Sequence, residues 1–242
     1  MGPDRRLVAA EAGEAEAVSL RDRLAELAAE EATLEAELAA FHADYLRVVG
    51  VVMARVAELE ARILALVAGR SHAAGDVRAA EAAQDRARRT TEEARTVPGP
   101  SGPPPTADLK RLFREAAKRM HPDLAADEDA RTHAEAFMKR LNQAYRAGDA
   151  EAIQDLVAQW DAGAPAAGAP PRLRGARQVV ALRAAVAEAQ QRIDELRSSQ
   201  LAQLMERAMA TSAGGGDFLT ETRAAAEAAL AAAQSRLDEL ER

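Results

Sequence analysis

Apolar residues recur at spacings of three and four along most of this chain, and this spacing is the strongest constraint on its fold. Such residues share one face of an α-helix, so a sustained stripe predicts a long helix that buries this face against another helix. The first stripe runs from about Ala15 to Leu66, long enough to predict a coiled coil, and its register slips by one residue before Val56. Its members are Leu20, Leu24, Leu27, Leu34, Leu38, Phe41, Tyr45, Val48 and Val52, then Val56, Leu59, Ile63 and Leu66.

Few bulky side chains are present to fill a large globular core. Aromatic residues make up 3% of the 242 residues, and alanine dominates the apolar content. Alanine buries little area. Four of the seven aromatic residues lie in one central stretch: Phe113, Phe137, Tyr145 and Trp160. We therefore predict an all-α protein in which helical hairpins or coiled coils flank a small, compact helical module.

Breaks in the helical pattern divide the chain. The segment 69–75 reads as a turn, after which a helix with an alanine stripe (Ala79, Ala83, Ala87) folds back on the first. Glycines at 214–216 break a later helix, and Asp217 can cap the next one. Two segments rich in proline or glycine bound the central module, as expected for an independently mobile domain. The predicted layout is an N-terminal coiled-coil hairpin (1–96), a linker (97–106), the module (107–160), a linker (161–171) and a C-terminal hairpin (172–242).

The first helix of the module is strongly amphipathic. Thr106 is a suitable N-cap, and Pro122 ends the helix because the residue before a proline avoids the α conformation. One face is apolar, with Leu109, Leu112, Phe113, Ala116, Ala117 and Met120. The other is basic and interrupted only by Glu115; its cations are Lys110, Arg111, Arg114, Lys118 and Arg119.

The second helix is predicted to begin near residues 127–129 and to end at about Tyr145. Its apolar stripe pairs antiparallel with that of the first helix. Gly148 and Asp149 then end it and cap a third helix. The stripes contain Met138, Leu141 and Tyr145, with Ala134 and Ala144, and then Ile153, Leu156, Val157 and Trp160. The tripeptide His121-Pro122-Asp123 should occupy an exposed, stiffened turn between the first two helices.

This central stretch resembles the J domain of DnaJ-type co-chaperones. The shared pattern is a basic helix, then His-Pro-Asp, then a helix ending in Ala-Tyr. The matching residues include Phe113, the tripeptide 121–123, Leu141 and the pair 144–145, and the resemblance covers residues 107–160. That family usually opens with a further short helix, but the proline-rich segment 97–105 stands there in this chain.

The resemblance implies that the basic helix docks on a DnaK-type chaperone and that the tripeptide promotes that chaperone's ATP hydrolysis. Asp123 would pair with an arginine of the partner, Pro122 would hold the turn rigid, and His121 would supply hydrogen bonds. The protein itself would be no enzyme and would need no cofactor. The coiled coils would set location, oligomerisation or client choice.

Two other interpretations stay open. The absent first helix and Glu115 favour a structural coiled-coil scaffold or adaptor whose J-like module is degenerate, although both His121 and Asp123 are retained. Nucleic-acid binding through the basic helix is weaker, because the net charge is −7 and no other basic patch occurs.

Several classes of site are disfavoured by the residues present. The chain has no cysteine, which excludes disulfides and thiolate chemistry, and its four histidines have no ligand-like spacing. No apolar stretch reaches about 18 residues, and the first residues are too acidic for a signal peptide. We therefore expect a cytoplasmic protein with no metal and no membrane contact.

Overall fold

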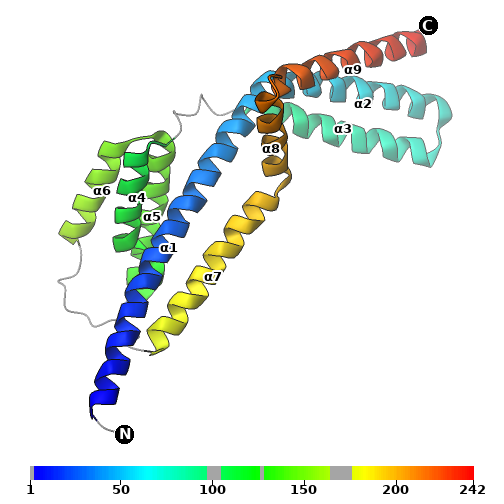
Figure 1. Cartoon of the computed structure of the whole chain (residues 1–242). Helices are drawn as coiled ribbons and strands as arrows, with labels where there is room; N and C mark the ends of the chain where they lie inside the picture. Colours follow the sequence, from blue (N-terminus) through cyan, green and yellow to red (C-terminus); the bar gives the residue numbers. More distant parts are fainter. Residues whose placement is uncertain (1–2, 97–104, 126–127, 164–175) are drawn as a thin grey trace. The chain divides into compact units, whose positions relative to one another are not determined.

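The computed structural model describes residues 3–96, 105–125, 128–163 and 176–242, and all regular structure in these ranges is helical (Figure 1). The predicted all-α class is confirmed. The helices form two compact units, each discontinuous in sequence. One unit joins Met1–Glu37 with Gly102–Ser199, and the other joins Leu38–Ser101 with Gln200–Arg242. The units therefore do not follow the sequential layout that we predicted. The linkers predicted at 97–106 and 161–171 lie mainly outside the described residues.

The long N-terminal helical stripe is one helical run with a local defect. Helix α1 (Pro3–Tyr45) continues through a π-helical turn, η1 (Leu46–Gly50), into α2 (Val51–Ser71). A π turn takes up extra residues relative to an α-helix, and this one lies just ahead of the predicted register slip. Gly50 is buried there, and a Cβ atom on it would lie 3.1 Å from Leu46 Cδ2.

The second unit is built around α2. Helix α3 (Ala74–Arg95) folds back along it after a turn shorter than predicted, in which His72 has a positive φ of 52°. Helix α8 (Gln200–Ala213) is followed by α9 (Phe218–Glu241), which Asp217 caps by accepting hydrogen bonds from two backbone N–H groups, and α9 packs along α2. The α2–α3 core consists of Ala57, Ala61, Ala83 and Ala87 with Leu64, whereas the predicted Ala79 is exposed.

In the first unit, α7 (Ala176–Ser198) packs on the N-terminal part of α1. Glu16 pairs with Arg183 and Glu30 with Arg197, so the two helices run parallel. The predicted C-terminal hairpin 172–242 is therefore wrong, because α7 belongs to this unit and α9 to the other. The apolar stripe of α7 is bulkier than the alanine-rich stripe of α9, and it buries against the leucines of α1. The shared core is Ala17, Leu24, Leu27, Val179, Leu182, Ala185, Ala189 and Ile193, flanked by Leu20, Leu34 and Val186.

The central module contains the helices that the sequence predicts. They are α4 (Ala107–Met120), the 3₁₀ turn η2 (Pro122–Leu124), α5 (Glu128–Ala147) and α6 (Ala150–Gly163). Thr106 caps α4 by accepting a hydrogen bond from the Leu109 N–H. Gly148 has a φ of +72° and ends α5, and Asp149 caps α6. Of the predicted core residues, Phe113, Ala116, Met120, Leu141 and Tyr145 are fully buried, while Leu112 and Met138 are partly buried.

The module does not close its core alone, so the predicted independent domain is wrong in this respect. Ala25, Ala29 and Ala32 of α1 lie in the same core as the buried residues of α4, α5 and α6. The Thr33 hydroxyl donates to the Ala29 carbonyl at 2.6 Å, so the Tyr145 hydroxyl donates to Thr33 at 2.7 Å. Helix α1 thus has a leucine face against α7 and an alanine face against the module. The alanine face of α1 therefore completes the apolar core of the three module helices.

Candidate functional site

The tripeptide His121-Pro122-Asp123 forms a tight turn between α4 and α5. The backbone N–H of Asp123 donates to His121 Nδ1 at 3.2 Å, and the N–H of Ala125 donates to the Pro122 carbonyl at 3.0 Å. Nδ1 therefore acts as an acceptor, which places the proton of the neutral imidazole on Nε2. This arrangement fixes the ring relative to the Asp123 carboxylate, whose Oδ2 lies 3.6 Å from Nδ1.

The turn is less exposed than the sequence predicts. The side chain of His121 is only 10% exposed and that of Asp123 is 34% exposed. Together with Pro122 they line a cavity of about 300 Å³. The opposite wall comes from α1 and α7 and includes Glu31, Glu188 and Arg192. The turn is covered because the same alanine face that completes the module core also brings α1 over the tripeptide.

Charged groups in this cavity change the electrostatic environment of the tripeptide. Arg192 donates to both carboxylate oxygens of Glu31, at 2.9 and 3.3 Å. That hydrogen bonding, with further attraction from Asp123, raises the pKa of the Arg192 guanidinium. Burial lowers the pKa of His121 below its usual value; Arg192 lowers it further, while Asp123 and Glu31 oppose the shift. His121 is therefore neutral at pH 7.

The lowered pKa of His121 predicts an acid-sensitive unit. In the unfolded chain the imidazole has a pKa of about 6.5 and binds a proton more readily than in the folded protein. Stability should therefore fall as the pH drops through 6.5 toward the lower folded pKa. We expect the urea midpoint, followed by Trp160 fluorescence, to fall more between pH 7.5 and 5.5 for the wild type than for His121→Gln. An equal fall in both proteins would contradict this assignment.

The five cations of the predicted basic face divide into two rows on α4. Arg111 and Arg119 form ion pairs with residues of the module itself, with Asp108 at 3.4 Å and Asp161 at 2.8 Å. Lys110, Arg114 and Lys118 follow at four-residue spacing and form the second row. Lys118 Nζ lies 2.8 Å from Asp22 Oδ1 of α1. The structure therefore does not present the basic residues as one uniform solvated face.

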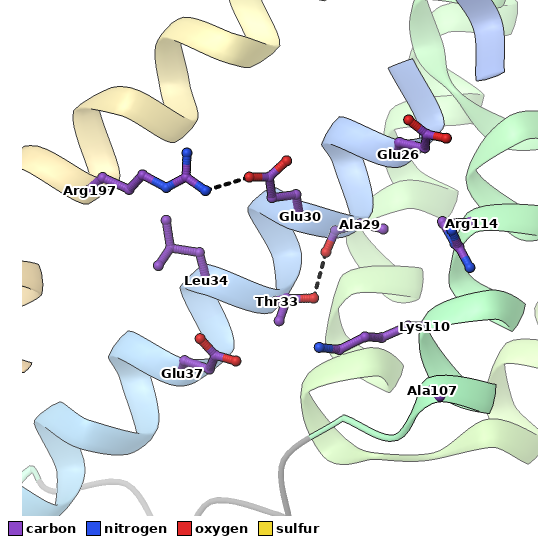
Figure 2. A pocket seen from close by; sticks show the side chains of 10 residues that line it. All are labelled: Glu26, Ala29, Glu30, Thr33, Leu34, Glu37, Ala107, Lys110, Arg114 and Arg197. Atoms are coloured by element: carbon purple, nitrogen blue, oxygen red, sulfur yellow. Dashed lines mark hydrogen bonds and ion pairs between the residues drawn. The ribbon is translucent and has the colours of Figure 1, made fainter. Parts of the chain in front are cut away.

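The second row faces carboxylates of α1 across a groove. Lys110 and Arg114 line one side of this groove of about 440 Å³, and Glu26, Glu30 and Glu37 line the other (Figure 2). Glu30 is paired with Arg197 of α7 at 2.5 Å. The facing charges are opposite in sign, and α1 and α4 run antiparallel. Asp22 pairs with Lys118 near the end of α4, and Glu37 lines the groove with Ala107 and Lys110 at the start of α4 (Figure 2).

The partners of the tripeptide and of the basic row were not predicted from the sequence. The acidic residues Asp22, Glu26 and Glu30 stand four apart on α1, so they share a helix face. That spacing matches the spacing of Lys110, Arg114 and Lys118, and it is the signal that could have linked the two helices. No comparable spacing pointed to Arg192, because its position opposite Asp123 depends on the parallel packing of α7 on α1.

Other kinds of site find no support in the part of the chain that the structure describes. Within these residues, no three His, Asp or Glu side chains gather closely enough to hold a metal ion. None of the described helices has the length and apolarity needed to cross a membrane. No family model, curated protein or solved structure matches this chain.

Proposed function

We propose that this protein is a J-type co-chaperone, whose basic helix and His-Pro-Asp turn bind a DnaK-type chaperone and stimulate its ATP hydrolysis. The observation that carries the proposal is the position of the tripeptide. Residues 121–123 form a hydrogen-bonded turn at the end of a basic helix, and that helix packs on a second helix that contains Ala144-Tyr145 in its last turn. This order of a basic helix, a turn and a second helix supports the proposal.

The residues of the turn have separate roles in this proposal. Asp123 supplies a partly exposed carboxylate for an arginine of the chaperone, and such charge-assisted contacts are short and strong. Pro122 and the hydrogen bond to His121 Nδ1 hold the turn before binding, which reduces the ordering cost of association. The neutral His121 keeps Nε2–H as a donor. The cations of α4 add attraction to an acidic partner surface.

Binding of the full chain to an ATP-loaded DnaK-type chaperone tests the proposal. We expect an affinity that weakens as salt rises, because paired charges are screened. Asp123→Asn should weaken binding by about tenfold or more, since breaking a charge-assisted contact costs a few kcal/mol. Asp129→Asn makes the same chemical change on an exposed part of α5 and should bind as the wild type does. Equal affinities for the wild type and Asp123→Asn would contradict the proposal.

The second candidate is a structural scaffold or adaptor with a degenerate J-like module. It is favoured by the burial of His121 against α1 and α7 and by the engagement of Lys118 with Asp22. In a scaffold these contacts would serve only to attach the module to α1. The Asp123→Asn experiment separates the candidates, because a scaffold gives no chaperone binding for that variant to lose.

A further inference from the structure

We propose that α1 and α7 act as an internal inhibitor of the module, occupying the docking site with the charge pattern that a partner would need to bind it. This inference rests on the proposed co-chaperone function. It assigns a regulatory role to residues of α1 and α7 that lie outside the J-like stretch.

One ion pair and one facing pair of opposite charges support the inference. The basic row on α4 needs an acidic partner, and α1 supplies Asp22 against Lys118 at 2.8 Å, with Glu26 and Glu37 in the groove beside Lys110 and Arg114. The acidic Asp123 needs a basic partner, and α7 supplies Arg192 on the facing wall of its cavity. Both halves of the docking site, cationic and anionic, thus face internal groups of opposite charge.

Apolar contacts supply most of the free energy that keeps α1 bound to the module. Exposed ion pairs contribute little by themselves, about 0–1 kcal/mol each. Ala25, Ala29 and Ala32 are nearly inaccessible in the module core, and small side chains let helices approach closely. The hydrogen bond from Tyr145 to Thr33 joins α5 to α1 at the same place. The alanines therefore hold α1 on the module, and the charged residues determine which surface it covers.

If α1 covers the docking site, the affinity of the chain for a chaperone should be reduced by a defined factor. If only a small fraction of molecules has α1 released, the apparent affinity for a partner falls by that fraction. Substitutions that release α1 should then tighten chaperone binding without touching any residue of the module. We expect a gain on the order of tenfold or more, with an upper limit set by the open fraction of the wild type.

The contact itself can be tested without any chaperone. The chain contains only three lysines, Lys110, Lys118 and Lys139, so products of lysine chemistry are easily assigned. A carbodiimide should join Lys118 to Asp22 in the wild type and give a peptide pair identified by mass spectrometry. Lys118 and Lys139 are both exposed, but the Lys118 ammonium is paired with Asp22, so an amine reagent should modify Lys118 more slowly than Lys139. In Asp22→Lys/Glu26→Lys, called the opened chain below, Lys118 should react faster than in the wild type.

Chaperone affinity is then compared between the wild type and variants that release α1. The opened chain reverses two charges, and Glu227→Lys/Asp238→Lys on α9 is its control with the same change in net charge. Ala29→Gln leaves charge unchanged and forces a larger side chain into the α1 contact, and Ala15→Gln on the exposed side of α1 is its control. Circular dichroism confirms that each variant is folded. We expect the opened chain and Ala29→Gln, but neither control, to bind more tightly.

The outcomes separate this inference from the proposed function. A Lys118–Asp22 cross-link together with tighter binding by both releasing variants supports the inference. If the wild type binds the chaperone and the releasing variants bind no better, inhibition is excluded while the proposed function stands. If the cross-link is absent and Lys118 reacts as fast as Lys139, the contact itself is excluded. If the cross-link forms but no variant binds a chaperone, the proposed function fails and inhibition fails with it.

Discussion

Replacing Phe113 with alanine is expected to lower the free energy of unfolding of the first unit by about 3–5 kcal/mol, the usual cost of such a truncation in a packed core. Phe113 is completely buried, and its ring lies 4.6 Å from that of Tyr145 between centroids. Phe113 shares its core with Leu109, Met120, Leu141 and Tyr145, so its truncation leaves a cavity among side chains that are already packed. A loss of this size is a large share of the 5–15 kcal/mol typical of a domain.

Urea unfolding followed by Trp160 fluorescence measures this loss. Trp160 is the single tryptophan of the chain and packs against the same core from α6, so its signal reports on the module. Val180→Ala serves as the control, because Val180 is 65% exposed on α7 and its truncation should change stability by less than about 0.5 kcal/mol. Similar midpoints for the two variants would show that Phe113 does not anchor the core.

The module could be predicted from sequence because its signals are local. Thr106, Pro122 and Gly148 mark helix ends by steric and hydrogen-bonding rules that act within a few residues. The apolar stripes of α4 and α5 contain side chains large enough to be recognised as core. Phe137 was the exception. It stands outside the predicted stripe, beside Met138, yet it is buried in the same core and packs with His133 and Trp160.

The assembly around the module could not be predicted, because it depends on alanines. The leucine stripe of α1 indicated one buried face, and α7 covers that face. Ala25, Ala29 and Ala32 form a second buried face, but alanine is common on exposed helix surfaces too and gives no distinct pattern. Each of the three buries little area. The exposure of the tripeptide also depends on helices that are distant in sequence. Its local turn was predicted, but its cover by α1 and α7 was not.

The largest functional effect is expected from His121→Gln in the opened chain. Releasing α1 should expose the turn, so the opened chain should accelerate ATP hydrolysis by a DnaK-type chaperone more than the wild type does. Glutamine retains polarity but loses the imidazole that Asp123 holds through its backbone N–H at 3.2 Å. If the ring acts in the stimulated state, removing it abolishes acceleration, although the basic row of α4 remains and binding persists.

Single-turnover ATP hydrolysis by a DnaK-type chaperone is therefore the decisive measurement for the co-chaperone function. It is measured with no addition, with the wild type, with the opened chain, and with the opened chain carrying His121→Gln. We expect modest acceleration by the wild type, stronger acceleration by the opened chain, and none once His121 is replaced. Hydrolysis unchanged by the folded opened chain at micromolar concentration, or accelerated equally with and without His121, would contradict the co-chaperone function.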